Sequence, residues 1–135
     1  RFKSVLSHAD SGLHPACRKA AEQLQATHLT GYLKGYIDLV LESEGKLYLI
    51  DYKSNLLDGY DETHLAEAMA HAHYYLQYLL YSIALKRYVT ARGHDFEVVF
   101  GGVRYLFVRG LDENGLGIWH DRPSAALLSA LEACF

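Results

Sequence analysis

Cysteine, proline and long apolar runs are all scarce in this chain of 135 residues. The two cysteines, Cys17 and Cys134, lie far apart, which excludes a disulfide framework, a C-x-x-C metal site and a four-cysteine iron–sulfur cluster. No apolar run reaches the roughly 18 residues that a membrane-spanning helix needs, and no signal peptide is recognisable. These absences predict a protein of the reducing cytoplasm with no membrane partner.

An excess of positive charge is also missing. The formal net charge is −3 and the isoelectric point is near 6.2, so the totals do not predict a strongly basic nucleic-acid-binding face. The motif G-x-x-x-x-G-K-[ST] does not occur, so we expect no ATPase motor within these residues. Half of the residues are hydrophobic and 13% are aromatic, which is enough for a real core and predicts one domain over residues 1–135.

The hydrophobic pattern predicts secondary structure in the order helix, strand, strand, long helix, strand, helix. Asp61 or Thr63 is expected to cap the long helix and Gly93 to end it. The pair Gly101-Gly102 predicts a bulge or bend in the strand that contains it. The expected elements are a helix over 15–26, a β-hairpin within 29–53, a helix over 62–92, a strand over 96–108 and a helix over 123–135.

The hairpin brings two acidic residues together. If Glu44 and Gly45 are the central residues of its turn, paired residue numbers sum to 89 and Asp38 lies directly opposite Asp51. Cross-strand Cβ atoms at such a pair are about 4.5–5.5 Å apart, a distance at which two carboxylates repel each other. A divalent cation between them reverses that interaction, and hard oxygen ligands suit Mg²⁺, Mn²⁺ or Ca²⁺.

A lysine completes this group on the same strand. Lys53 follows Asp51 by two residues, so it projects from the same face, roughly 6.6 Å further along. An ammonium at that place can reach the same substrate phosphate as a metal ion held by Asp38 and Asp51. The alternative interpretation of the D-x-K pattern is a solvated ion pair on an exposed face, and residue types and spacing alone leave both readings open.

Three motifs in order carry a family resemblance. "GYIDLV" at 35–40, "DYKSN" at 51–55 and "QYLLY" at 77–81 resemble the PD-(D/E)xK nuclease superfamily. More closely, they are similar to the RecB-type nuclease domains of exodeoxyribonuclease V beta subunits. The similarity runs from about Gly31 to the C-terminus.

The resemblance implies a fold and an activity. The implied fold is α/β (α+β), with a central mixed β-sheet flanked by helices in a restriction-endonuclease-like core. The implied activity is a Mg²⁺-dependent DNA exonuclease that acts in double-strand-break repair and recombination, with Mn²⁺ or Ca²⁺ as substitute ions. The implied partners are DNA, a helicase portion of the same parent chain and the other subunits of an exodeoxyribonuclease V complex.

The resemblance also implies roles for individual residues. Asp38 and Asp51 are the expected metal ligands, together with the backbone carbonyl of Tyr52. Lys53 is the expected catalytic lysine. Gln77 and Tyr81 lie four residues apart on one face of the long helix and are expected beside the active site, in contact with it or with DNA.

One metal ligand of the family, a histidine on a helix far upstream of the first Asp, has no counterpart in this sequence. His8, His14 and His28 precede Asp38, but none has the family's placement. The chain also opens at Arg1 without Met, so we expect a C-terminal fragment of a larger helicase–nuclease subunit. Two alternatives remain: a stand-alone nuclease of the phage or CRISPR type, and a catalytically incomplete domain that binds DNA or protein.

Overall fold

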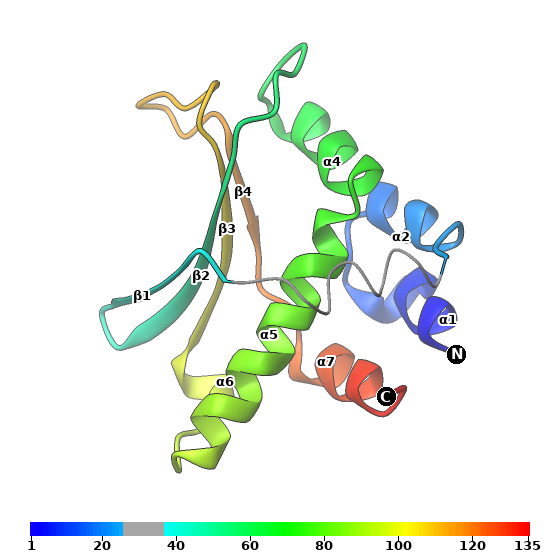
Figure 1. Ribbon diagram of the computed structural model, residues 1–135, viewed down its shortest axis with the longest axis vertical. Coiled ribbons are helices and arrows are strands. Elements are labelled where there is room, and N and C mark those ends of the chain that lie inside the picture. The colour runs from blue at the N-terminus through cyan, green and yellow to red at the C-terminus, as the bar shows by residue number, and fades with distance from the viewer. Residues whose placement is uncertain (26–36) are drawn as a thin grey trace.

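The computed structural model describes residues 1–25 and 37–135. Its centre is a four-stranded sheet in the order β1-β2-β3-β4 (Figure 1). The strands are β1 (Leu39–Ser43), β2 (Lys46–Lys53), β3 (Phe100–Phe107) and β4 (Ile118–Asp121). The β1–β2 and β3–β4 pairs are antiparallel and the central β2–β3 pair is parallel, which confirms a mixed sheet.

Helices cover one face of this sheet. In Figure 1, α4 and α5 lie along the sheet, and α1, α2 and α7 pack on their outer side. The helices are α1 (Phe2–Ser7), the 3-10 turn η1 (Ala9–Ser11), α2 (Pro15–Ala21), α4 (Glu62–His71), α5 (Tyr74–Ala91), α6 (Phe96–Val99) and α7 (Ala125–Glu132). The sheet and these helices confirm the predicted α/β class.

The predicted hairpin register is confirmed. Leu39 pairs with Ile50 and Ser43 pairs with Lys46, so the paired numbers sum to 89. Glu44 and Gly45, the two turn residues between the strands, have φ values of 52° and 76°. Positive φ at both central residues is the conformation that a tight hairpin turn requires. Positions 29–36 of the expected hairpin lie outside the described residues.

The single long helix expected over 62–92 is wrong, because the chain forms α4 and α5 with a break between them. At the break, His73 adopts the left-handed conformation with φ 55°, which ends a right-handed helical path. The His73 ring contacts the Tyr75 hydroxyl, with 3.0 Å between Nδ1 and Oη. The sequence contains no glycine or proline near His73 that would predict the break. Asp61 caps α4 and Gly93 follows α5, as predicted.

The predicted strand over 96–108 begins later than expected. Its first four residues form α6, because the Asp95 side chain accepts a hydrogen bond from the Glu97 amide and caps a helical turn. The predicted bulge is confirmed at Gly101, where the β2–β3 register shifts by one residue. A Cβ atom at Gly101 would lie 2.5 Å from the Tyr48 ring, so the ring covers the bulge only because glycine is there.

Two short elements have no counterpart in the prediction. Helix α1 lies in a region without clear periodicity, and β4 has only four residues. A strand that short shows too few alternations to be detected by pattern. Both contribute to the core: Leu6 of α1 is completely buried and Trp119 of β4 is 6% exposed.

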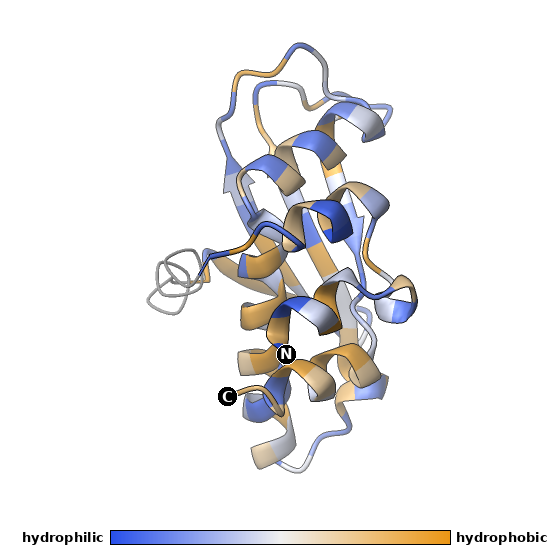
Figure 2. Cartoon of the chain, turned by 90° about the vertical axis from the view of Figure 1, so that its right-hand side faces the viewer, coloured by the Kyte–Doolittle hydropathy of each residue, from blue (hydrophilic) through white to orange (hydrophobic). Residues whose placement is uncertain are grey.

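The core lies between the sheet and α5. Helix α5 is apolar around most of its circumference, as expected of a helix covered on more than one side. The fully buried aromatic side chains are Tyr75, Tyr78, Phe100, Tyr105 and Phe107. Figure 2 shows hydrophobic residues gathered where α1, α5 and α7 meet.

A buried carboxyl group lies at the end of β4. The Tyr78 hydroxyl donates a hydrogen bond to Asp121. Burial raises the pKa of Asp121, and the bonds from Tyr78 and the Arg122 backbone lower it only in part. Beside them, burial and the Asp121 charge raise the pKa of the Cys17 thiol to about 12, so this thiol stays protonated and inert.

We predict that Asp121 makes the fold less stable as pH rises. Because its pKa is higher in the folded state than in the unfolded state, ionisation is disfavoured by folding, so stability falls as pH increases through this range. Asp121→Asn removes that contribution and keeps an acceptor for Tyr78. Urea unfolding at pH 4 and pH 7 should therefore show a smaller loss of stability in Asp121→Asn than in the wild type. The exposed Asp10→Asn serves as control, and an unchanged pH dependence in Asp121→Asn contradicts the account.

Candidate functional site

An acid and a base share the C-terminal end of β2. Asp51 and Lys53 project from the sheet face that the helices cover, with 3.0 Å between Lys53 Nζ and Asp51 Oδ1. The Asp51 side chain is 6% exposed and the Lys53 side chain 15%. The alternative prediction of a solvated surface pair is therefore wrong, because both groups are largely removed from water.

Asp38 lies across the hairpin from this pair, immediately before β1. Its Oδ2 atom accepts a hydrogen bond of 3.2 Å from the backbone amide of Tyr52, the residue that follows Asp51. Its negative charge acts on Asp51, whose pKa it raises. The hairpin thus brings the two residues together as the register predicted. Asp38 is exposed to solvent, whereas Asp51 is buried.

The Asp51 carboxylate lies beside one positive and one negative group. Burial is the largest cause of the raised pKa of Asp51. The Lys53 ammonium lowers this pKa in part, and the charge of Asp38 adds to the increase. Oδ1 is buried and lies 3.0 Å from the Lys53 ammonium. A buried carboxylate with a second carboxylate nearby is a place where positive charge is stabilising.

These oxygen donors fit a hard divalent cation such as Mg²⁺ or Mn²⁺. Across residues 1–25 and 37–135, no group of three His, Cys, Asp or Glu residues that could hold a metal ion occurs. Mg²⁺ usually keeps several waters and uses one or two protein carboxylates together with substrate phosphates. The pair of Asp38 and Asp51 is therefore a compatible, though minimal, ligand set.

Gln77 and Tyr81 lie on the face of α5 that contacts the sheet. Gln77 Nε2 donates to the Tyr81 hydroxyl at 3.3 Å, and the Tyr105 hydroxyl donates to Gln77 Oε1 at 2.6 Å. Burial raises the pKa of Tyr81; the Gln77 contact lowers it in part, and the charges of Asp51 and Asp38 raise it. The Tyr81 hydroxyl therefore remains protonated and lies within electrostatic reach of both carboxylates.

Two tyrosines at this site were not predicted as site residues. The ring centroid of Tyr74 lies 4.1 Å from Lys53 Nζ, and that of Tyr105 lies 5.4 Å away. Tyr105 is next to Asp51 because the parallel register pairs these two residues. Tyr74 lies three residues before the motif that begins at Gln77 and is not part of it. Sequence patterns give no signal for Tyr105, since the pairing of β2 with β3 is not visible in the sequence.

The loop after β2 is held in place by Tyr60. The Tyr60 hydroxyl donates to the Asn55 carbonyl at 2.9 Å and accepts from the Leu57 amide at 3.1 Å. The Tyr74 hydroxyl donates to Asn55 Oδ1 at 3.2 Å, which ties the loop to the helix beside Lys53. Between these anchors, Leu56 is 81% exposed, so a fixed loop presents an apolar side chain next to the site.

We predict that Gly110→Ala disrupts this loop. A Cβ atom at Gly110 would lie 2.0 Å from Cγ of Tyr60, so the ring must move and release its hydrogen bonds. Overpacking of this kind costs about 1–3 kcal/mol of unfolding free energy. The matched test is Gly110→Ala in a Tyr60→Ala background, where the ring is gone and only Cβ of residue 60 remains at 2.5 Å, so the added methyl group should cost less. Equal costs in both backgrounds contradict the predicted clash.

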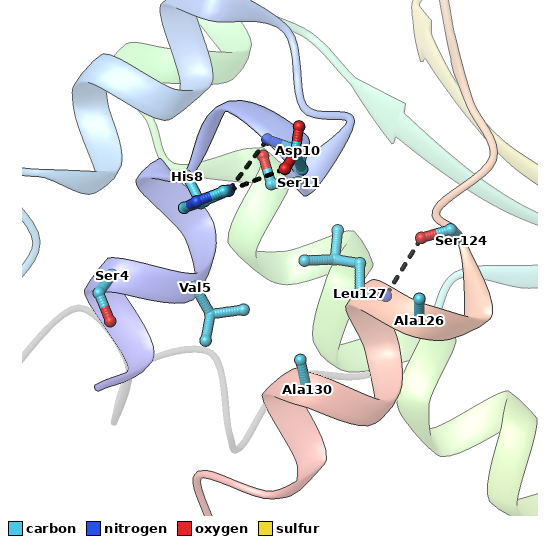
Figure 3. Close-up of a pocket in the computed structure, with 9 residues that line it drawn as sticks. All are labelled: Ser4, Val5, His8, Asp10, Ser11, Ser124, Ala126, Leu127 and Ala130. Carbon is cyan, nitrogen blue, oxygen red and sulfur yellow. Dashed lines mark hydrogen bonds and ion pairs between the residues drawn. The ribbon is translucent and has the colours of Figure 1, made fainter.

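The upstream histidines lie elsewhere. His8 caps η1 and pairs with Asp10 at 3.7 Å, and His14 caps α2 with its ring 5.7 Å from that of Trp119. His28 lies outside the described residues. His8 also lines a hollow of about 420 Å³ between α1 and α7 (Figure 3), which is mainly apolar and includes none of the predicted site residues.

Comparison with known proteins identifies the family of this chain. The family model of the PD-(D/E)XK nuclease superfamily matches residues 6–131. The chain is 43% identical over 122 residues to the RecBCD enzyme subunit RecB of Haemophilus influenzae. The aligned region covers 85% of this chain and 10% of that protein. The chain is 44% identical over 120 residues to RecB of Escherichia coli, covering 83% and 10%. It is also 44% identical over 138 residues to RecB of Mycobacterium tuberculosis, covering 90% and 13%. The chain thus spans about a tenth of the length of these curated relatives.

No helix among the described residues is long and apolar enough to cross a membrane.

Proposed function

Because the chain belongs to the PD-(D/E)XK nuclease superfamily, we propose that it is a metal-dependent deoxyribonuclease domain that hydrolyses phosphodiester bonds with Mg²⁺. Residues 1–135 form one domain in this proposal. It is a C-terminal part of a longer RecB-like helicase–nuclease that degrades DNA ends as an exonuclease in double-strand-break repair. Its partners are DNA, the helicase portion of the parent chain and the other subunits of the complex.

One observation carries the proposal: two carboxylates and an ammonium meet at the end of β2. Asp51 and Lys53 form a largely buried pair, and the charge of Asp38 acts on Asp51 from across the hairpin. An ion pair that serves stability alone has no need of a second carboxylate, because the charge of Asp38 disfavours the ionised form of Asp51. The same arrangement is useful when a cation and a phosphate enter it.

In this mechanism, Asp38 and Asp51 would hold the metal ion, and the Tyr52 carbonyl would be a further ligand. When bound, the metal supplies a nucleophilic water and neutralises charge on the phosphate. The carboxylates also orient the incoming water, since each keeps lone pairs for hydrogen bonding. Asp51 is the fixed member of the pair, because burial and the neighbouring strand restrict its side chain, and Asp38 is the more exposed one.

Lys53 stabilises charge in this proposal and does not abstract a proton. As the partner of Asp51 at 3.0 Å it is an ammonium, which has only donors to offer. Donors already placed where negative charge develops on the phosphate lower the barrier without reorganisation. Gln77 contributes an amide and Tyr81 a protonated hydroxyl at the same site, for contacts with water or DNA.

The direct test is cleavage of linear DNA by the full-length protein that carries this domain. Degradation should require Mg²⁺, stop when EDTA is added and resume when Mg²⁺ or Mn²⁺ is restored. Degradation that continues at the same rate in EDTA, or no degradation with either ion, contradicts the proposal.

A second candidate function has one observation in its favour. Within the part of the chain that the structure describes, no third His, Cys, Asp or Glu joins the two carboxylates in a metal-binding group. A catalytically incomplete domain that binds DNA or protein accounts for this as well. Saturable Mn²⁺ binding that depends on Asp51 separates the two, because an inactive module has no need for it.

A further inference from the structure

The Lys53 ammonium lies against two aromatic rings. Tyr74, the first residue of α5, places its ring centroid 4.1 Å from Nζ, and Tyr105 on β3 places its own at 5.4 Å. The two rings are tilted at 41° to each other with centroids 6.0 Å apart, and both contact the ammonium. Cations are attracted to the faces of such rings, more strongly where water is excluded.

A lysine side chain needs contacts of this kind to keep its ammonium in a fixed position. Its stem has four rotatable bonds, and its ammonium is a point charge with no preferred planar partner. Among the described residues, Asp51 is the acid that pairs with Lys53, and the same carboxylate is the proposed metal ligand. When a cation competes for Asp51, the rings remain as contacts that hold the ammonium in place.

Both tyrosines are fixed by their hydroxyl groups. The Tyr74 hydroxyl donates to Asn55 Oδ1 at 3.2 Å, and the Tyr105 hydroxyl donates to Gln77 Oε1 at 2.6 Å. The second bond also sets the Gln77 amide, because an accepting Oε1 leaves Nε2 to donate to the Tyr81 hydroxyl. Tyr105 thus touches Lys53 with its ring and orders Gln77 and Tyr81 with its hydroxyl.

We propose that Tyr74 and Tyr105 are positioning residues that hold the Lys53 ammonium at the site and, through Tyr105, orient Gln77. The inference rests on the proposed function for its consequence in catalysis. The placement of Lys53 is a separate property of the fold, and it is measurable without DNA or metal.

The experiment is NMR of the 135-residue chain with ¹³C-labelled lysine. Protons on Cε of Lys53 should be shifted upfield by the Tyr74 ring. Tyr74→Leu should remove most of that shift and Tyr74→Phe should preserve it, because the phenylalanine ring remains. Tyr88→Leu is the control: Tyr88 is on the same helix, and its ring lies 3.6 Å from the Arg92 guanidinium rather than beside Lys53. A Lys53 signal at the same position in Tyr74→Leu and the wild type overturns the proposal.

Cleavage by the full-length protein gives the second readout. Tyr74→Leu should lower the single-turnover rate on the order of 10- to 100-fold, as a misplaced catalytic group does, and leave the Mn²⁺ affinity unchanged. Tyr74→Phe should restore most of the rate. If Tyr74→Leu cleaves as fast as Tyr74→Phe while Lys53→Ala is inactive, the positioning role is wrong and the nuclease proposal stands. If Lys53→Ala cleaves normally, the nuclease assignment of Lys53 is wrong, whereas the NMR result still decides the placement.

Discussion

Lys53→Ala should lower DNA cleavage by the full-length protein that carries this domain by at least about 100- to 1000-fold. Removal of one donor that stabilises developing charge costs about this much in enzymes where it has been isolated. The loss is expected in the chemical step, because Lys53 is paired with Asp51 at the site and lies against ordered rings. DNA affinity should change little, since one ammonium among many contacts contributes modestly to binding.

The matched control for this prediction is Lys46→Ala. Lys46 begins the same strand, seven positions before Lys53, and its ammonium donates to the carbonyl of Val98. The Lys46→Ala substitution also removes a lysine side chain from β2, but it leaves Asp38 and Asp51 unchanged. Single-turnover cleavage should therefore be near normal in Lys46→Ala and undetectable in Lys53→Ala. Equal rates in the two variants contradict the role proposed for Lys53.

Asp51→Asn has the larger expected effect on activity and a different effect on stability. The amide keeps the shape of the side chain but loses the charge that is proposed to hold a divalent cation. Cleavage should therefore fall by more than about 1000-fold, which is several kcal/mol of transition-state stabilisation. Burial and Asp38 raise the pKa of Asp51, so its ionised form destabilises the fold above that pKa. At pH 7 the variant should unfold at the same temperature as the wild type or a higher one.

The two readouts together make the prediction specific. A residue that serves the fold should lower the unfolding temperature when it is replaced, whereas a residue kept for catalysis can raise it. The Lys53 ammonium keeps its contacts with the Tyr74 and Tyr105 rings when Asp51 loses its charge, so Asp51→Asn does not leave it without a favourable contact. A large fall in thermal stability together with the loss of cleavage indicates that Asp51 is structural.

The local pattern was sufficient to predict the hairpin and its register. Turn residues with positive φ and alternating strands fix which residues face each other, so the position of Asp38 opposite Asp51 follows from a few neighbouring residues. Gly101 was likewise predictable, because a glycine pair inside an apolar strand marks a bulge. These features depend on short-range geometry.

The break at His73 and the Tyr105 contact depend on tertiary structure. No helix-breaking residue precedes α5, and the left-handed His73 is favoured only where α4 and α5 pack in different directions. Tyr105 reaches Asp51 because β2 and β3 pair in parallel across a connection that contains α4, α5 and α6, and a one-dimensional pattern does not specify this pairing. The family resemblance supplied the order of the motifs but gave no information about the rings beside Lys53.

The most direct test of the central claim is titration of the 135-residue chain with Mn²⁺, followed by electron paramagnetic resonance of the free ion. The claim is that Asp38 and Asp51 form a divalent-cation site with Lys53 beside it. It predicts one saturable site in the wild type and in Lys53→Ala, and the loss of that site in Asp51→Asn. A wild-type chain without saturable binding, or binding that Asp51→Asn leaves unchanged, contradicts the claim.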